Sequence, residues 1–372
     1  MCSHHSVRLS RILFLACLVA VSGSRPHAGE APAGVDVSAA TVVVRASERP
    51  PAEQMAATVL IEEVATRTGL QWTQSATWPD AGPAVAITLA GTTSGWPREI
   101  PARQGERLPE LKPEGFRLCV EHREGAAPTV WIIGADARGA LFGAGQLLRS
   151  MKWAEGRVSL PDDLDVCTAP QYGIRGHQLG YRNTANAYDA WDVATYEQYI
   201  RELVIFGANC IENIPNQDDP GPHARVPRDQ MNVAMSEICQ RYGIDYWVWI
   251  PATFDLNDTA YRTQSLDELE NLFKSCPELS AVFIPGGDPG DNPPDMLLPY
   301  AEDMAKRLQP YHPAAKVWIS LQGFESDAVD AFFAWIDARQ PEWFGGVVHG
   351  PSSPSIADTR HRLSRQYGLR HY

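Results

Sequence analysis

The chain has 372 residues, of which 44% are hydrophobic and 21% charged, and its formal net charge is −13 at neutral pH. This length suits two domains, and the composition is that of a globular protein with well-formed cores. The acidic balance argues against nucleic-acid backbones and anionic membrane surfaces as partners. Net charge reports on solubility more than on chemistry, so it does not select a ligand.

The N-terminus has the pattern of a secretory signal. Arg8 and Arg11 precede an apolar run at residues 12–21, and small and polar residues follow it. A basic start, a short apolar segment and a small-residue exit are typical of a signal peptide, and the run is too short to span a bilayer. We therefore expect a signal peptide over residues 1–29 and a periplasmic or extracellular protein without stable membrane insertion.

The remaining cysteines show no metal-binding pattern. They contain no CxxC pair and no zinc spacing, so neither a metal nor a cofactor is predicted. Export would permit disulfides, but the apolar runs around Cys119 and Cys210 favour buried free thiols. The five positions beyond the signal are Cys119, Cys167, Cys210, Cys239 and Cys276.

Residues 31–169 are predicted to form a small α+β domain. After Pro50 and Pro51, apolar residues recur every three or four positions up to Gly69, which predicts a helix. A second helix is predicted from about residue 137, and strands with two packed helices form an α+β sandwich. Residues 92–114 are expected to be a loop and 161–170 a linker. The predicted strands are 41–45, 70–76, 84–91, 115–122, 129–136 and 157–160.

From residue 170 to 372 the pattern changes to a regular alternation of strand and helix. Six βα repeats with apolar strands, each about 30–40 residues long, are typical of a (β/α)8 barrel. Residues 368–372 begin a seventh strand, so we expect an α/β barrel that is incomplete at its C-terminus, after about six and a half repeats. A doubly wound open sheet is the alternative. The predicted strands are 172–181, 208–215, 245–252, 280–291, 315–324 and 343–351, and the helices are 194–206, 229–242, 265–274, 294–308, 326–339 and 357–367.

Polar and aromatic side chains accompany these strands toward their carboxyl ends, where a barrel carries its active site. Aromatic rings stack on the CH-rich face of a pyranose, while amides, arginines and carboxylates bind its hydroxyls. A carbohydrate is therefore the predicted partner, and the oligomeric state stays open. The predicted substrate-binding residues are Arg175, Gln178, Tyr181, Arg182, Trp249, Asp291, Gln322 and His349.

Two carboxylates are candidates for acid-base catalysis, since a positioned carboxyl group can give or take a proton. Asp288 follows the fourth strand and is predicted as the acid, because a pocket that excludes water would raise its pKa. Glu212, on the second strand, is predicted as the base or as a ligand of sugar hydroxyls. Structural roles remain open beside these: ion pairs for Arg175 and Arg182, a hydrogen bond for Glu212, and core packing for Trp247 and Trp249.

Three segments resemble the glycoside hydrolases of the bacterial β-hexosaminidase and α-glucuronidase group. Residues 134–151 (GADARGALFGAGQLLRSM) are similar to the end of their small N-terminal domain. Residues 174–215 resemble the first βαβ unit of their barrels, and residues 283–291 (FIPGGDPGD) resemble the fourth strand. The likeness spans about residues 40–372. It implies a hexosaminidase-like N-terminal domain, a catalytic-type TIM barrel and hydrolysis of glycosidic bonds in an oligosaccharide or glycan.

The sequence departs from this family at one informative position. In hexosaminidases an Asp-Glu pair follows two glycines, where the Asp orients the substrate's acetamido group and the Glu is the general acid. Here Asp288 matches the Asp, but Pro289 stands in place of the Glu and cannot donate a proton. A catalytically inactive carbohydrate-binding protein, or a truncated fragment, is therefore the alternative to a glycosidase.

Overall fold

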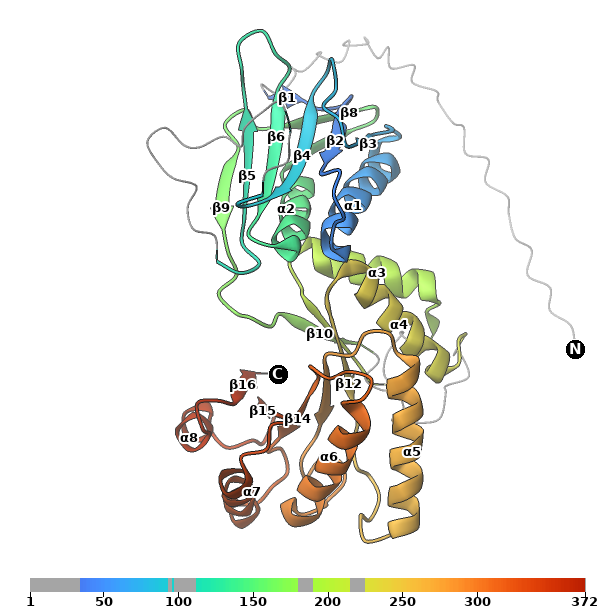
Figure 1. Cartoon of the computed structure of the whole chain (residues 1–372), viewed down its shortest axis with the longest axis vertical. Coiled ribbons are helices and arrows are strands. Elements are labelled where there is room, and N and C mark those ends of the chain that lie inside the picture. The colour runs from blue at the N-terminus through green and yellow to red at the C-terminus, as the bar shows by residue number, and fades with distance from the viewer. Residues whose placement is uncertain (1–33, 93–95, 97–111, 180–189, 215–224, 372) are drawn as a thin grey trace, which may run out of the picture. The chain divides into compact units, whose positions relative to one another are not determined.

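A computed structural model describes residues 34–92, 96, 112–179, 190–214 and 225–371. Figure 1 shows the arrangement of its elements. The chain from Gly34 onward is one compact unit, and its strands form sheets of three, six and seven members. No helix in the described ranges is long and apolar enough to cross a membrane.

The six-stranded sheet forms the first domain, with strand order β3-β2-β4-β6-β5-β9 (Figure 1). Helices α1 (Pro51–Thr68) and α2 (Ala137–Ser150) pack against each other and share one core with this sheet. A short antiparallel sheet joins β1 (Val35–Asp36), β8 (Arg157–Leu160) and β7 (Lys152–Ala154). The predicted α+β fold is confirmed. The sheet strands are β2 (Thr41–Val44), β3 (Thr73–Ser75), β4 (Ala84–Leu89), β5 (Phe116–Glu121), β6 (Thr129–Gly134) and β9 (Asp165–Thr168).

One expected linker is a strand instead. The segment 161–170 contains β9, which pairs antiparallel with β5 and adds an edge to the six-stranded sheet. Arg117 on β5 holds it through an ion pair with Asp165, with 3.1 Å between Nε and Oδ1. Only four residues long and starting with an aspartate, β9 lacks the apolar alternation by which strands are predicted. Most of the expected loop at 92–114 lies outside the described residues.

The second domain is a sheet of seven parallel strands in the order β10-β11-β12-β13-β14-β15-β16. Sequential order excludes the doubly wound alternative, because that fold reverses its strand order at a switch point. Within the described ranges β10 and β16 are the two end strands and do not pair. The strands are β10 (Gly176–Leu179), β11 (Cys210–Asn213), β12 (Asp245–Trp249), β13 (Ala281–Ile284), β14 (Lys316–Ser320), β15 (Phe344–His349) and β16 (Gly368–His371).

Helices follow the strands as the sequence predicts, and two of their boundaries differ from the prediction by more than one residue. α5 begins at Thr259, earlier than expected, because the Asp258 carboxylate accepts hydrogen bonds from the backbone N–H groups of Ala260 and Tyr261. Such a cap satisfies amides that the first helical turn leaves unpaired. α8 ends early, at Arg362. The helices are α3 (Val193–Ile205), α4 (Arg228–Tyr242), α5 (Thr259–Ser275), α6 (Pro294–Leu308), α7 (Ser326–Arg339) and α8 (Ile356–Arg362).

The inner face of the seven-stranded sheet is apolar and rich in tryptophan. Alternate residues of a strand point to one face, so residues two apart on β11 and β12 face the interior together. Trp247 and Trp318 contact there with ring centroids 5.4 Å apart. The interior cluster consists of Cys210, Ile214, Trp247, Trp249, Ala281, Phe283, Trp318 and Val348.

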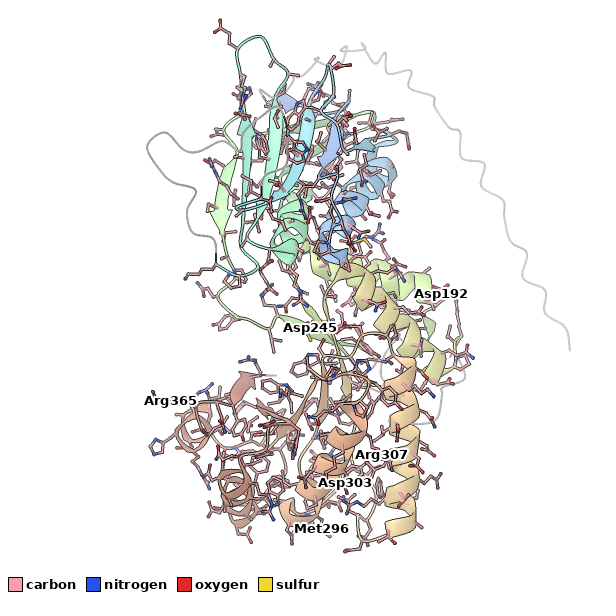
Figure 2. All side chains as sticks on the ribbon, in the orientation of Figure 1. Asp192, Asp245, Met296, Asp303, Arg307 and Arg365 are labelled. Carbon is pink, nitrogen blue, oxygen red and sulfur yellow. The ribbon has the colours of Figure 1, made fainter. Side chains whose placement is uncertain are left out.

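Charged side chains join the first domain to the amino ends of the barrel strands. Arg138 of α2 contacts Asp245 at the start of β12 with 2.6 Å between Nη2 and Oδ1 (Asp245 is labelled in Figure 2). Glu114 accepts hydrogen bonds from Asn209 and forms an ion pair with Arg175 at 2.8 Å. These contacts attach the first domain at the end of the barrel opposite to the strand carboxyl ends.

All five described cysteines are free thiols. Cys119, Cys210, Cys239 and Cys276 are buried, and Cys167 on β9 is exposed. The expectation of buried free thiols at Cys119 and Cys210 is confirmed.

Candidate active site

A cavity of about 830 Å³ lies on the inner face of the seven-stranded sheet. Side chains of β10, β11, β12, β15 and β16 line it, and Tyr172, 73% exposed, stands at its edge. This volume is within the usual range for small-molecule sites. The polar and aromatic lining residues are Tyr172, His177, Gln178, Glu212, Trp247 and Arg370.

Glu212 is the carboxyl group of this cavity. It is 9% exposed, and the Gln178 side-chain amide donates a hydrogen bond to its Oε1. The strand register places these two residues opposite each other and Trp247 on the other side of Glu212. Burial raises the pKa of Glu212 from 4.5 to about 7, and the hydrogen bond from Gln178 offsets part of that rise. Glu212 can therefore give or take a proton near neutral pH.

The raised pKa makes the stability of the fold depend on pH. The folded chain holds the Glu212 proton more tightly than the unfolded chain, so this stabilisation is complete below about pH 4.5 and is lost as the pH rises through about 7. Glutamine cannot ionise. Glu212→Gln should therefore raise the free energy of unfolding at pH 8 by up to about 3 kcal/mol, at ~1.4 kcal/mol per pKa unit. Urea unfolding at pH 8 and pH 4.5 tests this, and a similar gain at both values would contradict it.

Arg370 is a further nitrogen-bearing group of the cavity, whereas the His177 side chain points to the helix-facing side of β10, where its ring lies 5.6 Å from that of Tyr199 on α3. His177 Nδ1 and Arg370 Nε are buried and have no hydrogen-bond partner among the described residues. Burial lowers the pKa of His177, which favours its neutral form. A ligand that offers a hydrogen-bond acceptor to Arg370 Nε would remove the cost of leaving that atom unpaired.

Asp288 differs from the expectation for a catalytic acid. It is exposed, so the water-excluding pocket predicted around it is not found, and that property belongs to Glu212. Gln322 Nε2 donates a hydrogen bond to Asp288 Oδ2 at 2.9 Å. This contact does bring together two residues of the predicted site, on the loops after β13 and β14.

Asp288 and Glu212 also lie at different levels of the sheet. Glu212 is level with Ala281 through its pairing with Trp247, whereas Asp288 comes after β13 has ended at Ile284. The three residue steps from Ala281 to Ile284 alone span about 10 Å. Paired catalytic carboxylates are only about 5–9.5 Å apart. The geometry therefore gives no support to these two residues acting as one pair across a single bond.

Arg175 has the structural role that the sequence had left open. It precedes β10, where its side chain donates hydrogen bonds of 2.8 Å to the carbonyl oxygens of Gly207 and Tyr172 and pairs with Glu114. It is therefore at the amino end of the strand, and its expected place at the carboxyl end was wrong.

The other predicted substrate-binding residues are dispersed. Gln178 lines the cavity. Trp249 is 7% exposed and packs within the interior cluster. His349 is half-buried at the end of β15, and Asp291 is exposed with a φ of 52°. Tyr181 and Arg182 lie outside the described residues.

The loop that carries Asp288 and Asp291 is fixed by its neighbour Asn292. The buried Asn292 amide donates to the carbonyl oxygens of Ala252 and Phe254, both at 2.9 Å, and thereby ties the loop after β12 to the loop after β13. Asp288 and Asp291 therefore lie beside an asparagine whose side chain has a structural role. Across the described ranges no cluster of three or more His, Cys, Asp or Glu side chains could hold a metal ion.

Sequence reasoning missed two groups of the cavity. Arg370 lies on a predicted strand but was not selected, and Trp247 was weighed as core or as a sugar platform but was not chosen as a substrate-binding residue. Arg370 pairs with Val348, an interior residue, so it faces inward. The feature that marks Arg370 is a charged side chain at an inward-facing position of a short strand. That direction can be assigned only once the pairing register of the strand is known.

No family model matches the chain, and the match to a curated protein is partial. The chain is 24% identical over 237 residues to the probable α-glucuronidase A of Aspergillus niger. That match covers 55% of this chain and 26% of the fungal protein, so it spans about a quarter of the relative's length.

Solved structures match over a larger part of the chain. The chitobiase of Flavobacterium johnsoniae has a TM-score of 0.56 at 12% identity, covering 91% of this chain and 63% of that one. The N-acetyl-β-hexosaminidase of Streptomyces plicatus has a TM-score of 0.55 at 12% identity, covering 91% and 77%. A β-N-acetylhexosaminidase of Bacteroides fragilis has a TM-score of 0.55 at 10% identity, covering 89% and 76%. At identities this low, the structural similarity shows a shared fold. The chain therefore has the fold of the hexosaminidase-like glycoside hydrolases, as its sequence resemblance predicted.

Proposed function

We propose that this chain binds a glycan at the Glu212 cavity and hydrolyses a glycosidic bond, with Glu212 as the general acid. The observation that carries the proposal is the buried Glu212 carboxyl, whose pKa of about 7 keeps a large fraction protonated near neutral pH. A general acid works best when its pKa lies near the working pH. The fold shared with hexosaminidases supports the reaction class.

The neighbours of Glu212 suit this role. Gln178 fixes the orientation of the carboxyl, and Trp247 lines the same cavity with an aromatic ring suited to a sugar face. Glu212 would transfer its proton to the glycosidic oxygen as the bond to the anomeric carbon breaks, and the resulting carboxylate would take a proton back from the water whose oxygen ends on that carbon. Burial then favours reprotonation.

The nucleophile of this reaction need not come from the protein. Glu212 is the one carboxyl among the described residues that line the cavity. A substrate that carries its own nucleophile, such as an acetamido group, needs no second protein carboxylate. N-acetylhexosaminides are therefore the first substrates to test. α-Glucuronides come second, because of the partial match to an α-glucuronidase.

A pH–rate profile on aryl glycosides tests the proposal. Turnover by a general acid should be highest below about pH 7 and should fall as the pH rises through 7, because Glu212 loses its proton there. The panel contains aryl N-acetylglucosaminide, glucuronide and glucoside. Turnover that increases through pH 7 would contradict the assignment as acid.

A second outcome corresponds to a different function. Ligand-induced thermal shifts with the free sugars, without turnover of any aryl glycoside, would identify a carbohydrate-binding protein. Pro289, in place of the acid of hexosaminidases, is the observation that favours this alternative.

We also propose that the chain acts outside the cytoplasm, for which the signal-like pattern of residues 1–29 is the support. The mass of the mature chain tests this.

A further inference from the structure

Arg370 brings a half-buried positive charge into the Glu212 cavity. Its Nε atom is buried without a hydrogen-bond partner among the described residues, and its Nη1 donates a 3.3 Å hydrogen bond to the Leu369 carbonyl oxygen. Burial, and secondarily repulsion by Arg360, lowers the pKa of Arg370. Arginine nevertheless remains charged in proteins. A partly buried charge with an unpaired Nε is unfavourable, so a negative partner would stabilise this guanidinium.

The guanidinium of Arg370 is held in a fixed place. It lies over the Trp318 ring, 5.2 Å from the centroid, and Trp318 contacts Trp247 on the cavity wall. Two glycines make room for Trp318: a Cβ on Gly368 would lie 2.3 Å from its ring, and one on Gly345 would lie 2.5 Å away. The side chain is therefore ordered before any ligand arrives, which reduces the entropy cost of binding.

The cavity itself does not supply the missing negative charge. Glu212 is the one acidic side chain among its described lining residues, and burial raises its pKa to about 7. Below that pH it is mostly neutral, which leaves the positive charge of Arg370 uncompensated. Arg370 and Glu212 therefore serve different parts of a ligand.

We infer that Arg370 recognises an anionic substituent on the glycan, a carboxylate, sulfate or phosphate, and makes the cavity selective for acidic sugars. The planar guanidinium suits such groups because its N–H donors match two oxygens of one anion. The inference rests on the proposed location of the glycan, but it does not depend on turnover.

The test compares sugars that differ in one charge. Isothermal titration at pH 6 measures the dissociation constants of glucose against glucuronic acid and of N-acetylglucosamine against its 6-sulfate and its 6-phosphate. The wild-type chain should bind at least one anionic member about tenfold to a hundredfold more tightly than its neutral counterpart. The preferred anion identifies the substituent.

Arg370→Met should reduce that preference to about onefold, since methionine keeps much of the volume and removes the charge. Arg370→Lys keeps the charge without the planar fork, and we expect a reduced but measurable preference. Arg365→Met is the matched control, because Arg365 is exposed on the outer surface after α8 (Figure 2) and should leave the preference unchanged. Equal binding of charged and neutral sugars by the wild type, an unchanged preference in Arg370→Met, or no binding of any anionic sugar would overturn the inference.

The outcomes separate this inference from the proposed function. Glu212→Gln retains Arg370 and should keep the anionic preference even without turnover. A preserved preference in a chain that hydrolyses nothing would reject the hydrolase and retain the role of Arg370. Turnover without any charge preference would support the hydrolase and reject the role of Arg370.

Discussion

Glu212→Gln should lower kcat at pH 6 by about a hundredfold to ten-thousandfold, which is the usual contribution of a general acid. Glutamine has nearly the same shape and can still hydrogen-bond to Gln178, but it has no acidic proton. Binding of the sugar should change little, so KM should remain within a fewfold of the wild-type value. Initial rates on the preferred aryl glycoside give both constants.

Asp288→Asn is the comparison that locates the chemistry. Asp288 is exposed and bonded to Gln322, outside the cavity lining, so its loss should affect turnover less than the loss of Glu212. The reverse order, with Asp288→Asn inactive and Glu212→Gln near wild type, would move the acid to the carboxyl end of β13, as the sequence alone suggested. Aryl glycosides with better leaving groups should partly rescue Glu212→Gln, because they need less protonation.

Gly346→Ala should destabilise the fold by about 3–5 kcal/mol. Gly346 has a φ of 140°, which is essentially limited to glycine, and a Cβ there would lie 1.9 Å from the Gly368 carbonyl oxygen on β16. The pairing register between β14 and β15 also shifts immediately before Gly346, because Val317 pairs with Phe344 and the next residue, Trp318, pairs with Gly346. Adding one methyl group would therefore strain the backbone and push β15 and β16 apart. Urea unfolding measures the loss.

Gly156→Ala is the matched control for that change. Gly156 also has a positive φ, 64°, but nothing lies within 4 Å of an added Cβ. Its substitution should cost only about 1–2 kcal/mol, the penalty of a left-handed residue. Equal losses in the two variants would show that contact with β16 contributes nothing at Gly346.

The helices show what local sequence determines. α6 begins at Pro294, as predicted, because proline suits a first helical turn, and α7 begins at Ser326, also as predicted. β9 escaped prediction because its pairing with β5 is a long-range contact that its own four residues do not encode. Local patterns thus define most elements, while short edge strands depend on partners far along the chain.

The site shows the limit of the same reasoning. Asp288 was selected because polar residues after barrel strands are often catalytic, and this rule describes position rather than burial. Glu212 has a raised pKa because its carboxyl loses contact with water, and that burial follows from the packing of β10, β12 and their side chains. Arg370 shows the same dependence, because its inward direction comes from the pairing of β16 with β15.

The five described thiols divide sharply in their chemistry. Burial raises the pKa of Cys276 to about 12 and raises those of Cys210 and Cys239 well above the ordinary value, so these groups hold almost no reactive thiolate. Thiolate is the form that oxidants and alkylating reagents attack. Exposed Cys167 on β9 is then the position among them that such reagents can reach. A maleimide dye would label the native chain there, remote from the Glu212 cavity in sequence, and oxidising surroundings would leave the barrel thiols reduced.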